Sequence, residues 1–587
     1  MNVSDYVVQF LEALGLGHVF TVSGGGSIFL CDALARAKSI KYVCCHHEQA
    51  CTTAAEGYAR ARNHVGAAIV TSGPGGTNAV TGVAGAWLDG VPMIVISGQA
   101  FLKQTITDHP GLRQLGVQEI NIVDIVRPIT KYAVMVKHPV EIRYHLEKAW
   151  HLATTGRMGP VWLDIPGDIQ NAEIDPEIMT GYIPVQEPMP SARVAARAVA
   201  FNLVKSQRPL IHIGQGVRNA GAEERLFRLL DDYGIPVVSG RNANDVIPSA
   251  HPCYIGRPGT FAQRGANFAV QLCDFYLAVG TRLTLTQTGY NSKDYARGAA
   301  QIVQVDIDQA ELDKGTLRDP VKIRADAKAF LTELADALDE LPRPDWSAWL
   351  ARCQSLRDRY PVVLPEYKEQ KHGINSYHFI QALSDAARAD DVIVTDMGFA
   401  FQVTHQTWKV KSGQRLFTNC GLASMGWGLP AAIGAAIASS RRVILIAGEG
   451  GFQMTMQELA TVMHHKLNIK MFVLNNGGYA TIKQTQELGF QGRLMGVNED
   501  TGLSFPDLSL VAASYGMAGG DLGNVANLNI ALSIPGPFIC QINLDPNQPQ
   551  APRAINRRNP DGSMNPTPLE DAWPFLSPEV IQKEMQL

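Results

Sequence analysis

The stretch VILIAGEGGFQ, Val443 to Gln453, decides the fold of this chain. A run of mostly branched apolar residues ends in glycines, and a helix-like pattern follows. A buried strand that runs into glycines at the start of a helix is how α/β proteins hold phosphate groups. Glu449 lies in the middle of this loop, where its carboxylate would repel a phosphate. The loop therefore predicts a phosphate site only if another group reconciles the two negative charges.

The end of the next predicted strand supplies ligands for such a group. The segment MFVLNNGGY, Met471 to Tyr479, places Asn475 and Asn476 after a buried run. Because successive strands of a parallel sheet end on the same edge, we expect the side chains of Glu449 and Asn476 to converge. A carboxylate, an amide oxygen and a backbone carbonyl, here that of Gly478, are hard oxygen ligands that Mg²⁺ prefers, and Mg²⁺ also binds phosphate. The two loops thus predict a magnesium-bound phosphate, although glycine loops and paired asparagines are each common.

The fold class follows from the apolar pattern along the whole chain. Short β-branched runs alternate with longer helical periods, which is typical of βαβ units with parallel sheets. Each third of the chain carries about four strong candidates for buried strands. They are residues 41–45, 66–72, 92–98 and 160–166, then 208–214, 236–240, 275–280 and 302–308, then 391–396, 441–448, 470–476 and 536–545. We predict an α/β protein with three domains, each built on a mainly parallel sheet flanked by helices.

Proline-rich joints place the domain boundaries. They give an N-terminal domain over residues 1–182, a central domain over 190–342 and a C-terminal domain over 365–545. The tail, residues 546–587, is rich in Pro and Asn and has no period. It is either disordered or docked through Trp573, Phe575 and Leu576.

Composition excludes several classes of protein. The 587 residues are too many for one core, and 46% apolar and 18% charged residues describe an ordinary globular chain. A formal charge of -4 provides no basic field, so nucleic acid is not expected as a partner. Nine cysteines without a zinc spacing indicate reduced core thiols.

No membrane or export segment is expected either. The first 20 residues read as an amphipathic helix with acidic residues, not as a signal peptide. Two long uncharged stretches, 65–88 and 416–440, are rich in Gly, Ser, Thr and Asn and contain proline, which suits buried loops better than a span. We expect a cytoplasmic protein.

A second carboxylate completes the pattern. In YVCCHHEQACTTAAEGYAR, Glu48 begins a small-residue helix directly after a strand. On its own, an acidic residue in the first turn of a helix is explained by the helix dipole. It occurs here with TSGPGGTNAV from Thr71 and with CGLASMGWGLPAAIGAA from Cys420. Together with Gly-Glu-Gly and Asn-Asn, these segments resemble the acetolactate-synthase branch of thiamine-diphosphate enzymes over nearly the whole chain.

This resemblance implies a pyrimidine domain, a central FAD-type domain and a diphosphate domain. Glu48 would hydrogen-bond N1′ of the aminopyrimidine of thiamine diphosphate. Met425 would wedge the cofactor into its bent form, and Gly421 and Gly426 would leave room for it. The resemblance also assigns Pro74, Asn78 and Gln118 to the pyrimidine side or the substrate, and Gly398, Phe399, Ala400, Gly450 and Gly451 to the diphosphate.

The middle third resembles the FAD-binding segments of the same group, in HIGQGVRNAG, PVVSGRNANDVIP and GRPGTFAQRGANFAV. Ordinary turns would also explain these glycines. The residues that the resemblance assigns to FAD are Gly214, Gly216, Ser239, Arg257, Gly259, Thr260, Arg282, Asp306 and Asp326. FAD in that group is largely structural.

Several departures from the family bear on the substrate. The metal loop has Glu449 where the family usually has Asp. The tryptophan that selects the second keto acid corresponds to Thr485, and the carboxylate-binding arginine falls on Thr286, although Arg282 remains. A family lysine is replaced by Gly167. Between Gln99 and Gln118 the chain is longer than in the family, with GLRQLGVQE, residues 111–119, in place of a shorter segment.

Loss of an aromatic wall and two cations serves a carboxylate-bearing acceptor poorly, because a bidentate arginine is what recognises one. We therefore hypothesise a C–C bond-forming transferase that decarboxylates a 2-oxo acid, with pyruvate as the expected donor. Its acyl carbanion would pass to a carbonyl acceptor such as a keto sugar or another ketone, as in acetolactate-synthase-like enzymes of surface-sugar pathways. True acetolactate synthesis, simple decarboxylation, C–C hydrolysis of a dione, and a degenerate relative remain alternatives.

Two further expectations concern the site. His47 either acts as an acid or base toward the acceptor or has a structural role beside the strand. The family forms its site between two subunits, so the resemblance implies a homodimer or homotetramer in which Glu48 of one chain meets Glu449 and Asn476 of the other.

Overall fold

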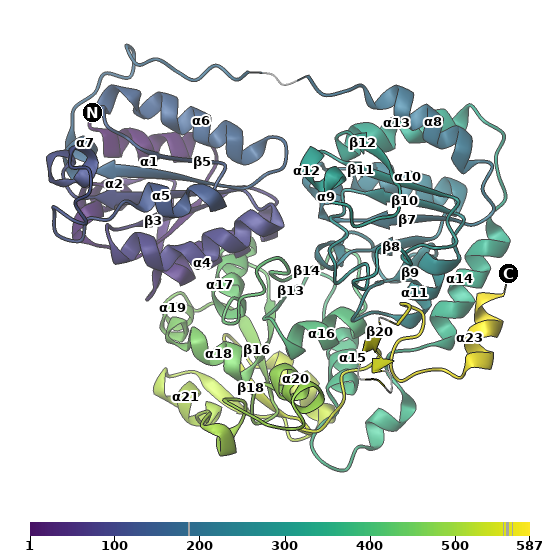
Figure 1. Cartoon of the computed structure of the whole chain (residues 1–587). Coiled ribbons are helices and arrows are strands. Elements are labelled where there is room, and N and C mark those ends of the chain that lie inside the picture. The colour runs from purple at the N-terminus through teal and green to yellow at the C-terminus, as the bar shows by residue number, and fades with distance from the viewer. Residues whose placement is uncertain (186–187, 556, 559–560, 562, 566, 587) are drawn as a thin grey trace. The chain divides into compact units, whose positions relative to one another are not determined.

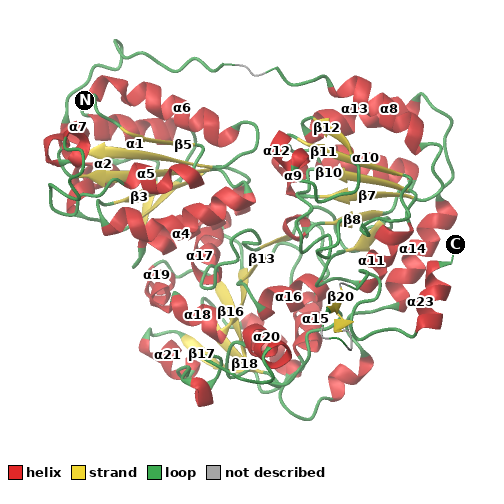
Figure 2. Cartoon of the chain, in the orientation of Figure 1, coloured by secondary structure: helices red, strands yellow, loops and turns green. Residues whose placement is uncertain are grey.

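The computed structural model describes residues 1–185, 188–555, 557–558, 561, 563–565 and 567–586. These residues form three six-stranded sheets, each flanked by helices (Figures 1 and 2). They divide into two compact units. The first unit comprises residues 1–186, 390–400 and 417–543, and the second comprises 187–389, 401–416 and 544–587. The predicted fold class is confirmed.

The first sheet is parallel and has the order β2-β1-β3-β4-β6-β5. Its strands are β1 (His18–Thr21), β2 (Lys41–Cys44), β3 (Gly66–Val70), β4 (Met93–Gln99), β5 (Tyr132–Met135) and β6 (Pro160–Pro166). Its helices are α1 (Val3–Ala13), α2 (Ile28–Arg36), α3 (Glu48–Arg62), α4 (Pro74–Asp89), α5 (Ile122–Val126), α6 (Ile142–Thr154) and α7 (Gly167–Asn171). The amphipathic helix predicted at the N-terminus is α1.

The central sheet is parallel and has the order β12-β11-β10-β7-β8-β9. Its strands are β7 (Pro209–Ile213), β8 (Val237–Ser239), β9 (Tyr254–Gly256), β10 (Phe275–Val279), β11 (Gln301–Asp306) and β12 (Val321–Arg324). Its helices are α8 (Ala192–Leu203), α9 (Gln215–Asn219), α10 (Glu223–Tyr233), α11 (Arg264–Leu272), α12 (Gln309–Asp313), α13 (Ala327–Asp339) and α14 (Ser347–Arg359).

The third sheet has the order β14-β13-β15-β16-β18-β17, and β13, β15, β16, β18 and β17 pair in parallel. Its strands are β13 (Val392–Thr395), β14 (Arg415–Phe417), β15 (Val443–Gly448), β16 (Ile469–Asn475), β17 (Ala518–Asp521) and β18 (Phe538–Asn543). Its helices are α15 (Ser376–Ala386), α16 (Phe399–Thr407), α17 (Gly428–Ser439), α18 (Glu449–Met454), α19 (Leu459–His464), α20 (Ala480–Gly489), α21 (Leu508–Ser514) and α22 (Leu528–Ser533).

Every predicted strand is present, and each sheet contains two more. The additional strands are β1, β5, β9, β12, β14 and β17. All of them except β1 lie at sheet edges. An edge strand is less completely covered than a central one and needs no continuous apolar run, so these strands give a weaker signal in the sequence.

Helices α3 and α17 pack closely within the first unit. A Cβ placed on Gly57 would lie 2.2 Å from the carbonyl oxygen of Ala431, and one on Gly434 would lie 1.9 Å from that of Ala54. Both helices are buried along most of their length. Glycine therefore allows the backbones of the first and third domains to touch.

The tail docks within the second unit. Its short strands β19 (Arg557–Arg558) and β20 (Met564–Asn565) pair antiparallel, and α23 (Pro578–Met585) follows. The Asn267 amide donates to the Leu569 carbonyl at 2.8 Å, and Arg352 pairs with the buried carboxylate of Glu584 at 2.9 Å. Leu569 and Leu576 pack on the central domain, whereas Phe575 remains 38% exposed. Docking is therefore the correct alternative, and it involves Leu576, as predicted, together with Leu569.

Among the described residues, no helix combines the length and the apolar character needed to cross a bilayer.

Candidate functional site

The third sheet reverses its strand order between β13 and β15, because β14 follows on one side of β13 and β15 on the other. In open α/β sheets, ligands bind outside the carboxyl ends of the strands at such a reversal. Gly398 and the start of α16 follow β13, and Glu449 is the first residue of α18 after β15. The two loops predicted to hold the diphosphate therefore flank the point where ligands bind in such sheets.

The Glu449 carboxylate is buried at this edge of the sheet. Its Oε1 accepts hydrogen bonds from the backbone N–H groups of Gly478 at 2.8 Å and Asn476 at 3.1 Å. Burial raises the pKa of Glu449 to about 7, against the effect of these N–H donors, which lower it. The expected convergence with Asn476 thus occurs through its backbone, because the longer glutamate side chain reaches the loop itself.

The types of ligand present here fit a magnesium ion. The Glu449 carboxylate packs against the loop of Asn476 and Gly478. A carboxylate, the Asn476 amide oxygen and the Gly478 carbonyl are all hard oxygen ligands. Within the described ranges, no group of three or more His, Cys, Asp or Glu side chains is placed to hold a metal. The predicted magnesium ligands include only one side chain of these four types, that of Glu449, because the other two are an amide oxygen and a backbone carbonyl.

The glycines beside Glu449 are required by packing. A Cβ on Gly450 would lie 2.0 Å from the Tyr479 ring, and one on Gly451 would lie 2.1 Å from Oδ2 of Asp396. Gly398 has a φ of +79°, and no atom lies within 4 Å of its Cβ position. The start of α16 at Gly398 is therefore open, whereas the Gly450–Gly451 turn is tightly packed.

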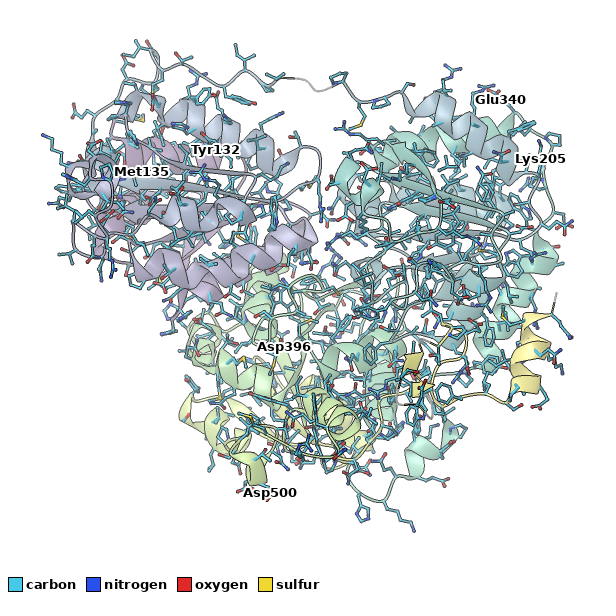
Figure 3. The ribbon with its side chains drawn as sticks, in the orientation of Figure 1. Tyr132, Met135, Lys205, Glu340, Asp396 and Asp500 are labelled. Carbon is cyan, nitrogen blue, oxygen red and sulfur yellow. The ribbon has the colours of Figure 1, made fainter. Side chains whose placement is uncertain are left out.

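Asp396, which follows β13 and is labelled in Figure 3, was not predicted from the sequence. It holds the Met425 loop through Gly426. Its carboxylate accepts hydrogen bonds from the N–H groups of Met397 at 2.8 Å and Gly426 at 3.1 Å. Burial raises the pKa of Asp396 to about 6. Because N–H and C=O of a trans peptide point in opposite directions, the bond to Gly426 also fixes the direction of the Met425 carbonyl.

Glu48 lies at the start of α3 and is buried. The Asn78 amide donates to its Oε2 at 3.0 Å, and the Cβ position of Gly75 is 3.6 Å from its Oε1. The structure thus brings Glu48 together with Asn78 on α4, which Pro74 begins. These three predicted residues form one group at the carboxyl edge of the first sheet.

The structure places His47 at the start of a helix and Gln118 in an exposed segment. His47 is the N-cap of α3, where its Nδ1 accepts a hydrogen bond from the Gln49 N–H at 3.1 Å. Gln118 is exposed at a φ of +57°, and the Cβ position of Gly73 lies 2.6 Å from its carbonyl oxygen. The buried Glu119 carboxylate braces the lengthened segment, because it accepts from the N–H groups of Ile106 and Leu115, each at 3.0 Å.

The residues predicted to face FAD lie at the carboxyl edge of the central sheet, whose strand order reverses between β7 and β10. At this reversal, the Cβ positions of Gly214 and Gly216 lie 2.1 Å and 2.7 Å from Gly280 atoms. Several predicted side chains have partners in the protein: Ser239 bonds Tyr254, Thr260 accepts from Arg241, Asp306 accepts from the Asp308 N–H, and Asp326 caps α13. Gly259 has a φ of +132°, and its N–H donates to Asn267.

Arg257 is an exception at this edge. It is completely buried, and its Nη1 donates to the carbonyl oxygens of His405 at 2.6 Å and Trp408 at 2.9 Å. In the part of the chain that the structure describes, its Nε and Nη2 have no hydrogen-bond partner, and neither does either ring nitrogen of His405. Burial lowers the pKa of His405 well below its usual value. Buried donors without acceptors fit a bound molecule that supplies acceptor atoms.

Thr485, Thr286 and Gly167, at the candidate acceptor positions, carry no charge. Thr485 is exposed on α20, where its hydroxyl donates to the Thr481 carbonyl at 3.0 Å. The Thr286 carbonyl accepts the Thr260 N–H, and Arg282 is engaged with Glu311 at 2.9 Å. The Cβ position of Gly167 lies 2.8 Å from the Phe101 ring, so an aromatic ring adjoins the position of the family lysine.

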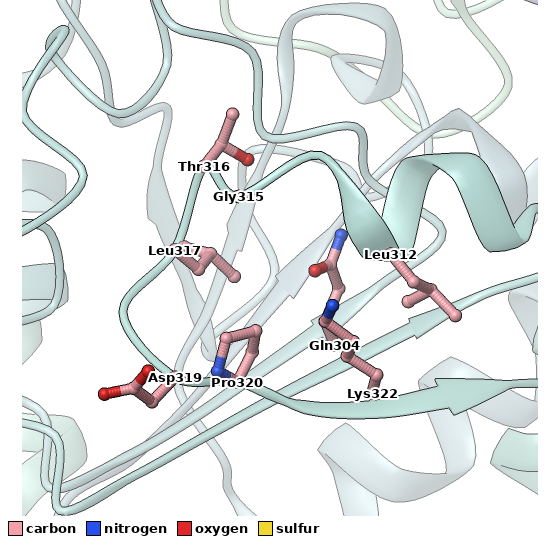
Figure 4. A pocket seen from close by; sticks show the side chains of 8 residues that line it. All are labelled: Gln304, Leu312, Gly315, Thr316, Leu317, Asp319, Pro320 and Lys322. Carbon is pink, nitrogen blue, oxygen red and sulfur yellow. The ribbon is translucent and has the colours of Figure 1, made fainter.

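A separate cavity of about 450 Å³ lies in the central domain (Figure 4). The residues that line it are Gln304, Leu312, Lys322 and, between α12 and β12, Gly315, Thr316, Leu317, Asp319 and Pro320. None of the residues predicted to bind FAD or substrate belongs to its lining. The cavity is therefore distinct from the predicted site residues of the central domain.

Comparison with known families gives three successive matches. Residues 1–125 match the thiamine pyrophosphate enzyme N-terminal TPP binding domain, residues 196–334 the central domain, and residues 396–533 the C-terminal TPP binding domain. The three matches follow the order of the three sheets.

Similar proteins extend over most of the chain. Acetolactate synthase isozyme 2 large subunit of Escherichia coli is 32% identical over 597 residues, covering 100% of this chain and 99% of the relative. Acetolactate synthase large subunit of Corynebacterium glutamicum is 35% identical, covering 88% and 82%. A probable acetolactate synthase large subunit of Methanocaldococcus jannaschii is 34% identical, covering 88% and 87%.

Proposed function

Since the chain belongs to the thiamine pyrophosphate enzymes of the acetolactate-synthase type, and is therefore a thiamine-diphosphate-dependent enzyme of C–C bond formation, we propose that it decarboxylates pyruvate and transfers the two-carbon acyl unit to a carbonyl acceptor. The observation that carries the proposal is the Glu449 carboxylate held on the Asn476–Gly478 loop at the strand reversal of the third sheet. This is the expected position of a metal that anchors a diphosphate.

Each cofactor has a proposed set of residues. Thiamine diphosphate, when bound, supplies the electron sink for the acyl unit. Glu449, Asn476 and Gly478 would hold Mg²⁺, and the open turn at Gly398 would admit the diphosphate. Glu48, oriented by Asn78, would hold a proton at N1′ of the aminopyrimidine. Met425 would pack against the cofactor from its fixed loop.

FAD would bind at the carboxyl edge of the central sheet. The reversal between β7 and β10, the close contact of Gly214 and Gly216 with Gly280, and the unpartnered donor atoms of Arg257 support this placement. A flavin absorbance that copurifies with the protein and is lost on Arg257→Ala, while the fold remains intact, is the expected result.

The acceptor is proposed to be uncharged at its reacting end. Thr485, Thr286 and Gly167 stand where the family has a tryptophan, an arginine and a lysine, and Arg282 is engaged with Glu311. A carboxylate-bearing acceptor would therefore lack its bidentate partner among these positions. The second candidate is acetolactate synthesis, which the relatives named above support. These relatives give no support to a keto-sugar acceptor.

One experiment separates these outcomes. Purified protein is supplied with thiamine diphosphate, Mg²⁺ and pyruvate, and CO₂ and products are measured with no acceptor, an aldehyde, a simple ketone and a keto sugar. The leading proposal expects CO₂ release that increases with an uncharged acceptor. Acetolactate as the main product in every arm would favour the second candidate, and absence of pyruvate consumption would refute the donor.

We also propose a homodimer or homotetramer, in which Glu48 and Glu449 from different subunits meet.

A further inference from the structure

A buried charge cluster joins α3 to α4 in the first domain. The Arg60 guanidinium pairs with Glu56 and with Asp89, each at 2.7 Å, and the three side chains are at most 3% exposed. Glu56 and Arg60 are one helical turn apart, and Asp89 is the last residue of α4. A buried guanidinium between two carboxylates has its charge compensated and its hydrogen bonds aligned.

The same carboxylates bind both ends of the loop 419–427 of the third domain. The Trp427 indole N–H donates to Glu56 at 2.7 Å, and the Asn419 amide donates to the same oxygen at 3.2 Å. The backbone N–H of Cys420 donates to Asp89 at 3.0 Å. Asn419 in turn accepts the N–H groups of Leu422 and Ala423, which closes a turn inside the loop.

The close contacts around this loop leave little room for displacement. A Cβ on Gly85 would lie 2.3 Å from the Asn419 amide, and one on Gly421 would lie 2.7 Å from both Leu88 and Asp89 atoms. The Arg60 guanidinium lies 5.8 Å from the centre of the Trp427 ring. The loop is therefore bound at its first residues and at its last residue by the first domain.

Met425 lies between these two attachment points. Its following peptide is fixed by the bond from the Gly426 N–H to Asp396. Replacement of a buried ion pair by apolar groups is often neutral for stability, so stability alone is a weak reason for such a cluster. Fixed geometry of the loop is the property that the cluster supplies.

We propose that Glu56, with Arg60 and Asp89, positions the loop 419–427 so that Met425 is held against the bound cofactor. The inference rests on the proposed function. Glu56 and its partners are positioning residues, since they contact the loop and not the reacting atoms. Glu48 and Glu56 lie eight positions apart on α3, about 12 Å along its axis. Helix α3 therefore carries both Glu48, which is predicted to hold a proton, and Glu56, which is proposed to position Met425.

The test uses Glu56→Gln and Trp427→Phe in the full-length protein. Trp427→Phe keeps a smaller aromatic ring at this buried position and removes the N–H donor to Glu56. Asp391→Asn is the matched control, because it removes another buried ion pair of the first unit, between Asp391 and Arg442 at 2.6 Å. Three quantities are measured: amide hydrogen exchange of residues 419–427 without cofactor, the dissociation constant of thiamine diphosphate with Mg²⁺, and the rate of deuterium exchange at C2 of the bound cofactor.

The proposal expects faster amide exchange in 419–427 and C2 exchange slowed by about tenfold to a hundredfold in Glu56→Gln and Trp427→Phe, as for a misplacement of about 1 Å. Asp391→Asn should leave the amide exchange of 419–427 and the C2 exchange within about twofold of the wild type. If Glu56→Gln fails to fold, Trp427→Phe provides the test. Folded variants with unchanged C2 exchange, or equal losses in Asp391→Asn, would overturn the inference alone. A wild-type protein that binds no thiamine diphosphate would overturn the proposed function as well.

Discussion

The Glu449 carboxylate accepts a 2.8 Å hydrogen bond from the backbone N–H of Gly478, which joins two successive loops at the carboxyl edge of one sheet. The acidic residue in the glycine loop is thus part of the internal structure of the third domain. Its Oε1 is held beside the backbone N–H groups of Asn476 and Gly478.

Substitution of Glu449 tests this arrangement. Glu449→Ala should abolish the effect of Mg²⁺ on thiamine diphosphate affinity, because the charged ligand is removed. Glu449→Asp should retain the effect, because the carboxylate is kept with one methylene fewer. Titration calorimetry with and without Mg²⁺ measures both. Full Mg²⁺ dependence in Glu449→Ala would show that Glu449 is not a ligand.

Substitution of Glu48 tests the role of the pyrimidine domain. Glu48→Gln keeps the hydrogen-bonding shape beside Asn78 and removes the acid, so turnover of pyruvate should decrease by about 10² to 10⁴-fold. Circular dichroism should show an unchanged fold. Steady-state kinetics at saturating cofactor provides the measurement, and near-normal turnover would refute the assignment.

The close contact between α3 and α17 predicts a large effect on stability. Gly434→Ala would bring a Cβ to 1.9 Å from the Ala54 carbonyl, and should lower the free energy of unfolding by about 1–3 kcal/mol. Gly489→Ala is the control, because nothing lies within 4 Å of its Cβ position, and it should change stability by less than about 1 kcal/mol. Urea unfolding compares the two variants. Similar midpoints would contradict the predicted contact.

The buried Asp164 predicts a pH dependence of stability. Burial raises its pKa to about 7, although Ser97 and Gln99 donate to it at 2.6 Å and 3.1 Å. Because the folded pKa exceeds that of the unfolded chain, the native state binds more protons between about pH 4 and 7, and the contribution of Asp164 to stability falls as pH rises through this window.

Asp164→Asn removes that titration. The difference in urea midpoint between pH 5 and pH 8 should therefore be smaller in Asp164→Asn than in the wild type. Ser97→Ala serves as the control, because it removes one hydrogen bond to Asp164 and keeps the carboxyl group. Equal pH dependence in the wild type and Asp164→Asn would contradict the raised pKa.

Buried strands explain how much of the fold was predictable. Strands such as β15 and β16 are covered on both faces and appear as continuous apolar runs, which sequence alone reveals. Edge strands such as β17, with the sequence AGGD and no buried residue, carry no such run. Their pairing is decided by the neighbouring strand and not by their own residues.

The candidate site was predictable where chemistry follows strand ends. Glu449, Asn476 and Gly398 each follow a predicted strand, and parallel pairing places them at one edge. Glu56 and Arg60 resemble an ordinary pair on a solvated helix face when read in sequence. Only the tertiary contact with Asp89, Asn419 and Trp427 shows their role, because these residues are distant in the chain.

The attachment of loop 419–427 to Glu56 and Asp89 also determines how this protein can be recombined with its relatives. A chimera that exchanges residues 1–186 alone would place foreign side chains opposite Asn419, Cys420 and Trp427. Exchange of the first domain together with residues 417–543 keeps these pairs intact. The first and third domains should therefore be exchanged together, although the sequence of the central domain separates them in the gene.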